Sequence, residues 1–174
     1  MVNVSVLIGT YNRCERLRGT LQALKAQRLD AGMAPELVVV DNRSTDATRA
    51  VVEEEGARAP WPVRYVYEPM QGLCAARNRA IHEARGRWLA FIDDDVRPDQ
   101  EWLRMIVRAF QQWNAEGVCG RVLPIWEVEG VKPSSMTTCR GGVPFNPAPG
   151  AISPTFHVNT PVVLLKSTFS DAGR

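Results

Sequence analysis

The sequence lacks the clusters of cysteine and histidine that build zinc sites. Among its 174 residues there are four cysteines, no two of which form a C-x-x-C pair, and only two histidines. A zinc site of the Cys/His type therefore has almost no ligands to draw on. We expect free thiols, most of them buried, at Cys14, Cys74, Cys119 and Cys139.

Long apolar runs and an excess of one charge are also missing. The longest apolar stretches, such as residues 36–40 and 161–165, reach only four or five apolar residues, whereas a membrane-spanning helix needs about 20. The N-terminus shows no cationic start followed by a long apolar core, so we expect no secretory signal. The 21 Lys and Arg against 19 Asp and Glu give a net charge of +2, too small to indicate a nucleic-acid partner. We expect a cytoplasmic protein.

The composition is that of one globular domain. Hydrophobic residues make up 45% of the chain and charged residues 23%, which argues against a disordered protein. A length of 174 residues is short for two domains of roughly 100–150 residues each. We therefore predict a single domain spanning residues 1–174.

Strand and helix signals alternate along the first two thirds of the chain. Leu17, Leu21 and Leu24 fall on one helix face, Asn12 followed by Glu15 resembles a capping box, and Asp46 can cap the next helix. The alternation predicts an α/β fold with a mostly parallel sheet, right-handed crossovers and helices on both faces. Strands are expected at residues 2–8, 37–40, 63–67, 88–92 and 118–123.

The composition changes after the fifth predicted strand. Residues 132–154 are rich in Pro, Gly, Ser and Thr, which predicts a long mobile loop. Residues 156–165 return to a strand-like sequence, and residues 166–172 resemble the start of a short helix.

Polar residues follow three of the predicted strands. They are Thr10-Tyr11-Asn12, Asp41-Asn42 and Asp93-Asp94-Asp95. Because ligands of an open parallel sheet bind at the carboxyl ends of its strands, we expect these residues to share one crevice. Residues 9–12 do not supply the G-x-G-x-x-G of a nicotinamide-binding domain, and the Gly-rich basic first loop of nucleotidyltransferases is also missing.

The three consecutive aspartates indicate a divalent metal. In an extended segment Asp93 and Asp95 point to one side and Asp94 to the other. Two carboxylates that face the same way repel one another unless a cation lies between them, and oxygen ligands suit Mg²⁺ or Mn²⁺. The alternative is that these residues merely cap a loop before Pro98.

Four further residues are compatible with two roles each. Tyr11 fits a surface aromatic or a ring that stacks on a base, and Asp41 fits a turn residue or an acceptor for a base or ribose. Arg77 and Asn78 either cover the sheet or bridge the carboxylates.

Four segments together resemble one family. They are residues 4–13 (VSVLIGTYNR), 38–48 (VVVDNRSTDAT), 72–78 (GLCAARN) and 88–95 (WLAFIDDD), and their order and spacing are similar to family 2 glycosyltransferases of the GT-A fold. The resemblance covers roughly residues 2–123, and a weaker match continues through 158–159 to 167–173. It implies a nucleotide-sugar-binding half at 1–123 and a partial acceptor-side segment at 124–174.

The resemblance assigns roles to individual residues. It implies that Tyr11 lies along the nucleotide base, Asp41 binds the base edge, Asp93 approaches the ribose, and Asp95 binds Mn²⁺ or Mg²⁺ on the diphosphate. Arg77 is implied to support the acidic cluster. The implied nucleotide-binding residues are Thr10, Tyr11, Arg13, Asp41, Arg77, Asp93 and Asp94, with Asp95 as the metal ligand.

The implied reaction is transfer of a sugar, with inversion, from a nucleotide-diphosphate donor to an acceptor hydroxyl. A UDP-sugar is the expected donor and a saccharide or glycolipid the expected acceptor; the resemblance is also compatible with peripheral membrane association and a homo-oligomer. The metal would stabilise the departing diphosphate and a carboxylate base would take the proton. The family places that base beyond the region matched by residues 159–173, so we identify no catalytic base. The alternative is a truncated, catalytically weak or inactive nucleotide-sugar-binding module.

Overall fold

The computed structural model describes residues 3–113, 115, 117–118, 120 and 164–166. Strands and helices alternate within this part of the chain, as the sequence predicts. In order, the elements are β1 (Val4–Thr10), α1 (Cys14–Lys25), β2 (Pro35–Asp41), α2 (Thr48–Ala57), β3 (Val63–Tyr67), α3 (Leu73–Glu83), β4 (Trp88–Phe91), α4 (Trp102–Trp113), β5 (Gly117–Val118) and β6 (Leu164–Lys166).

The sheet is mostly parallel, which confirms the predicted fold class. Its strand order is β3-β2-β1-β4-β6-β5, and the pairs β1–β2, β1–β4 and β2–β3 are parallel. Strand β5 runs in the same direction as this set but does not pair with it, because β6 lies between β4 and β5 and pairs antiparallel with both. The edge of β4 is therefore taken by a segment from far along the chain.

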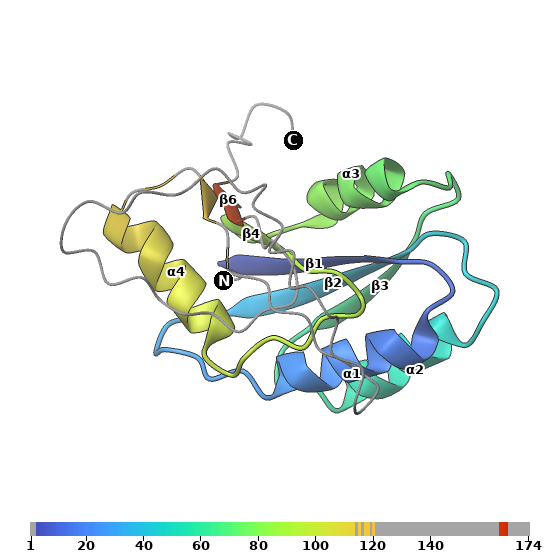
Figure 1. Cartoon of the computed structure of the whole chain (residues 1–174), viewed down its shortest axis with the longest axis horizontal. Coiled ribbons are helices and arrows are strands. Elements are labelled where there is room, and N and C mark those ends of the chain that lie inside the picture. Colours follow the sequence, from blue (N-terminus) through green and yellow to red (C-terminus); the bar gives the residue numbers. More distant parts are fainter. Residues whose placement is uncertain (1–2, 114, 116, 119, 121–163, 167–174) are drawn as a thin grey trace, which may run out of the picture.

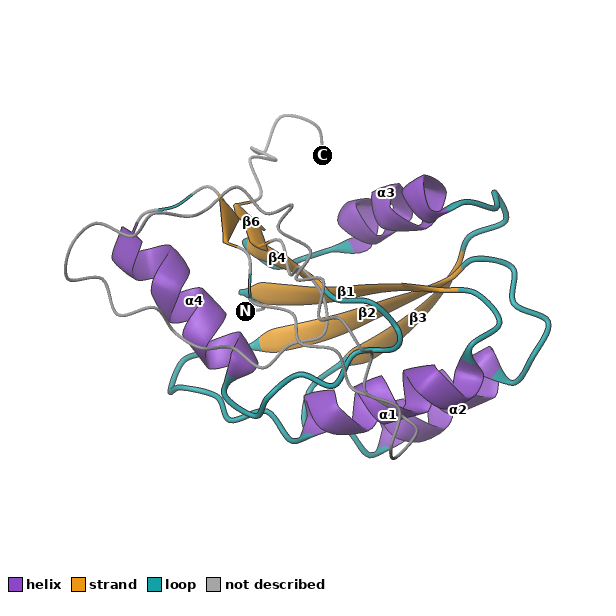
Figure 2. Ribbon diagram, viewed as in Figure 1, coloured by secondary structure: helices purple, strands orange, loops and turns teal. Residues whose placement is uncertain are grey.

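Helices cover both faces of the sheet (Figures 1 and 2). On one face, α1, α2 and α4 share a core with the side chains of alternate strand residues, such as Leu37 and Val39 of β2. On the other face, α3 packs Ala76 and Ala80 against the intervening residues, such as Val38 and Val40. The period of two along β2 thus explains why an uninterrupted apolar run is buried on both sides.

The carboxyl ends of β1 and β4 differ from the prediction, as does that of β2, which ends at Asp41 and not at Val40, and all three border the crevice. Strand β1 continues past Gly9 because Thr10 still pairs with Asp41 of β2. Strand β4 ends at Phe91, one residue earlier than expected, so the aspartates that follow lie in a loop and a turn.

The start of α1 is capped from a different loop than the sequence suggests. The N-cap residue Arg13 makes no side-chain cap bond, and the predicted capping role of Asn12 is wrong. Instead the Asp46 carboxylate accepts from the backbone N–H of Cys14 at 3.0 Å and from that of Thr48, at the start of α2, also at 3.0 Å. Asp46 thus binds the first N–H of α2 from one residue before the N-cap Ala47, and the same side chain serves α1 as well.

Several predictions fall on residues that the structure does not describe. They include the mobile loop at 132–154 and the greater part of the strands at 118–123 and 156–165. Lys166 belongs to strand β6, so the helix predicted at 166–172 does not begin there; residues 167–172 lie outside the described part. None of the described helices has the length and apolar character needed to cross a bilayer.

Candidate functional site

An open cleft of about 440 Å³ lies where the carboxyl ends of β1, β2 and β4 meet the start of α3. The polar residues that follow separate strands therefore come together, as the parallel topology predicts. Seven of the eight predicted site residues line the cleft: Thr10, Tyr11, Arg13, Arg77, Asp93, Asp94 and Asp95.

Asp94 is buried and fully engaged by neighbouring groups. The Thr10 hydroxyl donates to its Oδ2 at 2.7 Å, and the Arg13 guanidinium reaches its Oδ1 at 3.3 Å. The Thr20 hydroxyl donates to its backbone carbonyl at 2.9 Å, and only 5% of the residue is exposed. Asp94 therefore holds the end of β1 and the start of α1 in place, and both its carboxylate oxygens are already occupied.

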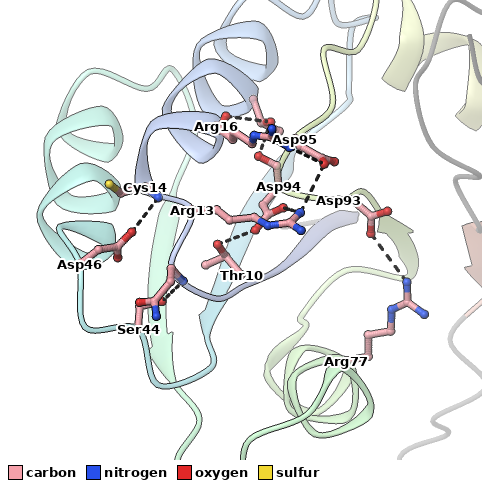
Figure 3. A network of polar contacts seen from close by, with 12 residues as sticks. Thr10, Arg13, Cys14, Arg16, Ser44, Asp46, Arg77, Asp93, Asp94 and Asp95 are labelled. Carbon is pink, nitrogen blue, oxygen red and sulfur yellow. Dashed lines mark hydrogen bonds and ion pairs between the residues drawn. The ribbon is translucent and has the colours of Figure 1, made fainter. Parts of the chain in front are cut away.

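Asp95 is more exposed and shares its arginine with Asp94. Its Oδ2 lies 3.3 Å from Arg13 Nη1 and 3.6 Å from Arg16 Nη1, and 37% of the side chain is exposed. Figure 3 shows Asp94 and Asp95 on the side of Arg13, with Asp93 turned towards Arg77. The predicted alternation, with Asp93 and Asp95 on one side, is wrong because the residues form a turn.

Asp93 is half exposed and lies on the α3 side of the cleft. Its Oδ1 is 3.7 Å from Arg77 Nη2. Partial desolvation raises the pKa of the Asp93 carboxyl above its usual range, Arg77 opposes this rise, and the charges of Asp95 and Asp94 add to it. This carboxyl therefore keeps its proton to a higher pH than an ordinary aspartate.

The oxygen donors of the cleft fit a divalent metal that is shared with a ligand. Among the described residues no group of three His, Cys, Asp or Glu side chains could hold an ion. Mg²⁺ and Mn²⁺ commonly use one or two carboxylates, with phosphate oxygens and water completing the octahedron. The partly exposed Asp95 matches a site of this type, and Asp93, which is turned towards Arg77, would supply a second carboxylate only from the α3 side of the cleft.

Tyr11 and Asp41 lie at the ends of neighbouring strands but differ in exposure. Tyr11 is 46% exposed at the cleft. Asp41 is 3% exposed and lies outside the cleft lining, since its Oδ2 accepts from the Tyr65 hydroxyl at 2.7 Å and its Oδ1 from the Ser44 N–H at 2.8 Å. Burial and the Asp41 contact raise the pKa of the Tyr65 hydroxyl. Contact of Asp41 with a base stays a prediction.

Sequence reasoning placed Asn42 in the crevice without giving it a role, and it missed the other residues that complete the cleft. Gly72 and Ala76 fall within the 72–78 segment, from which only Arg77 was assigned, and Asn42 directly follows the strand end at Asp41. The small residues allow close approach: a Cβ at Gly9 would lie 3.3 Å from the Ala76 Cβ, so α3 rests directly on β1. The further lining residues are Gly9, Asn42, Gln71, Gly72, Leu73 and Ala76.

A sequence profile of "Glycosyl transferase family 2" matches residues 5–158. The glycosyltransferase AglE of Haloferax volcanii is 33% identical over 119 residues, which cover 68% of this chain and 39% of AglE.

Two solved structures share the fold. S. aureus TarS 1-349 in complex with UDP-GlcNAc gives a TM-score of 0.61 at 25% identity, covering 76% of this chain and 38% of that one. Mannosyltransferase PcManGT from Pyrobaculum calidifontis, in complex with GDP-Man and Mn²⁺, gives a TM-score of 0.64 at 26% identity, covering 70% and 36%. The chain therefore spans well under half the length of the relatives it matches.

Proposed function

The chain belongs to glycosyl transferase family 2, and from this premise we propose that its cleft binds the nucleoside diphosphate sugar donor of a glycosyltransferase. The observation that carries the proposal is the composition of the cleft: an exposed tyrosine at one strand end, partly exposed carboxylates at another, and arginines beside them. The GDP-Man and Mn²⁺ bound to PcManGT and the UDP-GlcNAc bound to TarS support this assignment.

Each part of the cleft suits one part of such a donor. The exposed ring of Tyr11 offers a surface on which a base can stack. Helix α3 begins at the cleft, and its N-cap residue Gly72 makes no side-chain cap bond. The free N–H groups and positive end of this helix favour a diphosphate, and Arg77 on the same helix adds a full positive charge.

The metal would be held by Asp95, with Asp93 nearby. A divalent ion stabilises the negative charge on a departing diphosphate. Asp94, with both oxygens engaged, instead keeps Thr10 and Arg13 in position. Arg13 and Arg16 balance the charge of Asp95, so the protein alone offers the ion little net attraction. We therefore expect metal and nucleotide to bind together.

The reaction that the family resemblance implies for this cleft is sugar transfer with inversion. The acceptor oxygen bonds to the anomeric carbon as the bond to the diphosphate oxygen breaks, and a carboxylate base accepts the hydroxyl proton. We assign no base among the described residues. The identity of the acceptor, as a saccharide or glycolipid, the cytoplasmic location and self-association stay predictions.

Calorimetry with UDP and GDP tests the proposal. We expect Mn²⁺ or Mg²⁺ to tighten binding of one nucleotide by at least about tenfold relative to EDTA, which corresponds to about 1.4 kcal/mol. Asp95→Asn removes the charged ligand and should abolish this metal dependence. Glu53→Gln is the matched control, because Glu53 is an exposed carboxylate on α2 that pairs only locally, with Arg49 at 2.8 Å.

Two results would contradict the proposal. Equal affinity with and without metal would show that the acidic cluster is not a metal site, and no binding of either nucleotide would show that the cleft is not a donor site. An assay of nucleoside diphosphate release, with a panel of nucleotide-sugar donors and acceptors, distinguishes an active glycosyltransferase from a module that only binds the donor. Metal-linked binding without turnover would support the nucleotide-sugar-binding module.

A further inference from the structure

One wall of the cleft is an irregular segment that the side chain of Asn42 ties to the sheet. Residues 68–72 connect β3 to α3, and Gln71 and Gly72 of this segment line the cleft. The Asn42 Nδ2 donates to the backbone carbonyls of Met70 at 2.6 Å and Glu68 at 3.3 Å. The Asn42 Oδ1 accepts from the Gly72 N–H at 2.6 Å. One amide thus satisfies three backbone groups within five residues.

Asn42 is itself fixed to the sheet. It directly follows β2, it is only 5% exposed, and its backbone N–H donates to the Thr10 carbonyl at 2.9 Å. Thr10 also lines the cleft and contacts Asp94. Asn42 therefore connects the strand that carries the first group of site residues with the 68–72 segment.

Side-chain packing does little to hold the segment. The Met70 side chain is 70% exposed. Gly72 has a φ of +142°, a conformation that residues with side chains rarely adopt. The backbone of residues 68–72 therefore depends on hydrogen bonds to other parts of the protein. Asn42 makes three of them, and the Glu68 N–H donates a further one to the Asp41 carbonyl at 2.9 Å.

We propose that Asn42 is a positioning residue that sets the affinity of the cleft for its nucleotide by fixing the 68–72 segment and the start of α3. The inference rests on the proposed function. Helix α3 begins immediately after Gly72 and carries Arg77, which lies 3.7 Å from Asp93. A shift of the segment would therefore move the helix N-terminus and Arg77 relative to the acidic cluster. Asparagine suits the position because it donates and accepts at once.

Binding of Mn²⁺ with UDP and GDP to two variants tests the role. Asn42→Ala removes all three bonds, and Asn42→Asp keeps an acceptor for the Gly72 N–H but loses the donor. We expect Kd for the preferred nucleotide to rise roughly tenfold in Asn42→Ala and by a smaller factor in Asn42→Asp. If Asn42→Ala does not fold, the Kd of Asn42→Asp is compared with that of the wild type instead.

Asn3 offers a closely matched control at the amino end of β1, away from the cleft at the carboxyl end. Its Nδ2 donates to the Gly32 carbonyl at 2.8 Å and its Oδ1 accepts from the Ala34 N–H at 3.0 Å, just before β1 begins. Asn3→Ala and Asn42→Ala should both lower the melting temperature, but Asn3→Ala should leave Kd within about twofold because the two sites are independent.

Amide hydrogen exchange provides a readout that does not depend on the nucleotide. Exchange at residues 70–72 should be faster in free Asn42→Ala than in the wild type and unchanged in Asn3→Ala. If the wild type binds nucleotide and both Asn42 variants bind it equally well, the inference is overturned while the proposed function stands. If the wild type binds no nucleotide, the proposed function fails first.

Discussion

Removal of the Asp46 carboxylate should weaken two helices at once. Asp46 accepts from the first N–H of α1, at Cys14, and from the first N–H of α2, at Thr48. A cap bond contributes about 1 kcal/mol, so Asp46→Ala should lower the free energy of unfolding by about 2 kcal/mol. For a chain of this size that corresponds to a fall in melting temperature of about 4–8 °C.

The measurement is urea or thermal unfolding followed by circular dichroism. Glu53→Ala is the control, because Glu53 is an exposed carboxylate on α2 whose solvent-screened ion pair with Arg49 contributes little to stability. A loss of stability in Asp46→Ala no larger than in Glu53→Ala would refute the double-cap reasoning.

The contribution of Asp46 should also depend on pH. Burial alone would raise the pKa of the Asp46 carboxyl, but the hydrogen bonds from Thr48 and Cys14 outweigh burial and lower it. A carboxylate with a lowered folded-state pKa stabilises the protein above about pH 4 and loses this contribution as the pH falls through the folded-state value. The difference in stability between wild type and Asp46→Ala should therefore shrink between pH 7 and pH 3. A difference that stays constant over this range would contradict the assignment.

Three further substitutions test the packing and the base pocket. Gly86→Ala should lower the free energy of unfolding in urea by at least about 2 kcal/mol, because the added Cβ would lie 2.5 Å from the Ser5 nitrogen and 2.6 Å from the Val4 carbonyl carbon. A decrease below about 0.5 kcal/mol would contradict this. Tyr11→Ala should weaken nucleotide binding about tenfold, since stacking on an aromatic ring contributes about 1–3 kcal/mol, and an unchanged Kd in calorimetry would place the base elsewhere. Asp41→Ala should reduce discrimination between UDP and GDP while leaving metal dependence intact; unaltered discrimination would count against a base contact.

Local patterns in the sequence were sufficient to predict the elements from β1 to α4 and the cleft at the carboxyl ends of the strands. Leu17, Leu21 and Leu24 repeat at helical spacing and are all buried in α1. The alternation of strands and helices implies a parallel sheet, and a parallel sheet brings its carboxyl strand ends to one edge, so the convergence of Thr10 and Asp93 on one cleft was predictable. These features depend on periodicity and chain order, which are properties of the sequence itself.

The tertiary structure alone decided how the residues of the site are connected. Asp46 caps a helix 32 positions earlier in the chain, and Asn42 binds a segment about 28 positions later. Arg16 reaches Asp95 from the first turn of α1, and the turn at Asp94 and Asp95 directs these two side chains away from Asp93 (Figure 3). Such contacts depend on the path of irregular loops and on hydrogen bonds of about 3 Å, which no residue spacing encodes. Chain order thus specified which strand ends meet, while loop geometry determined which side chains touch.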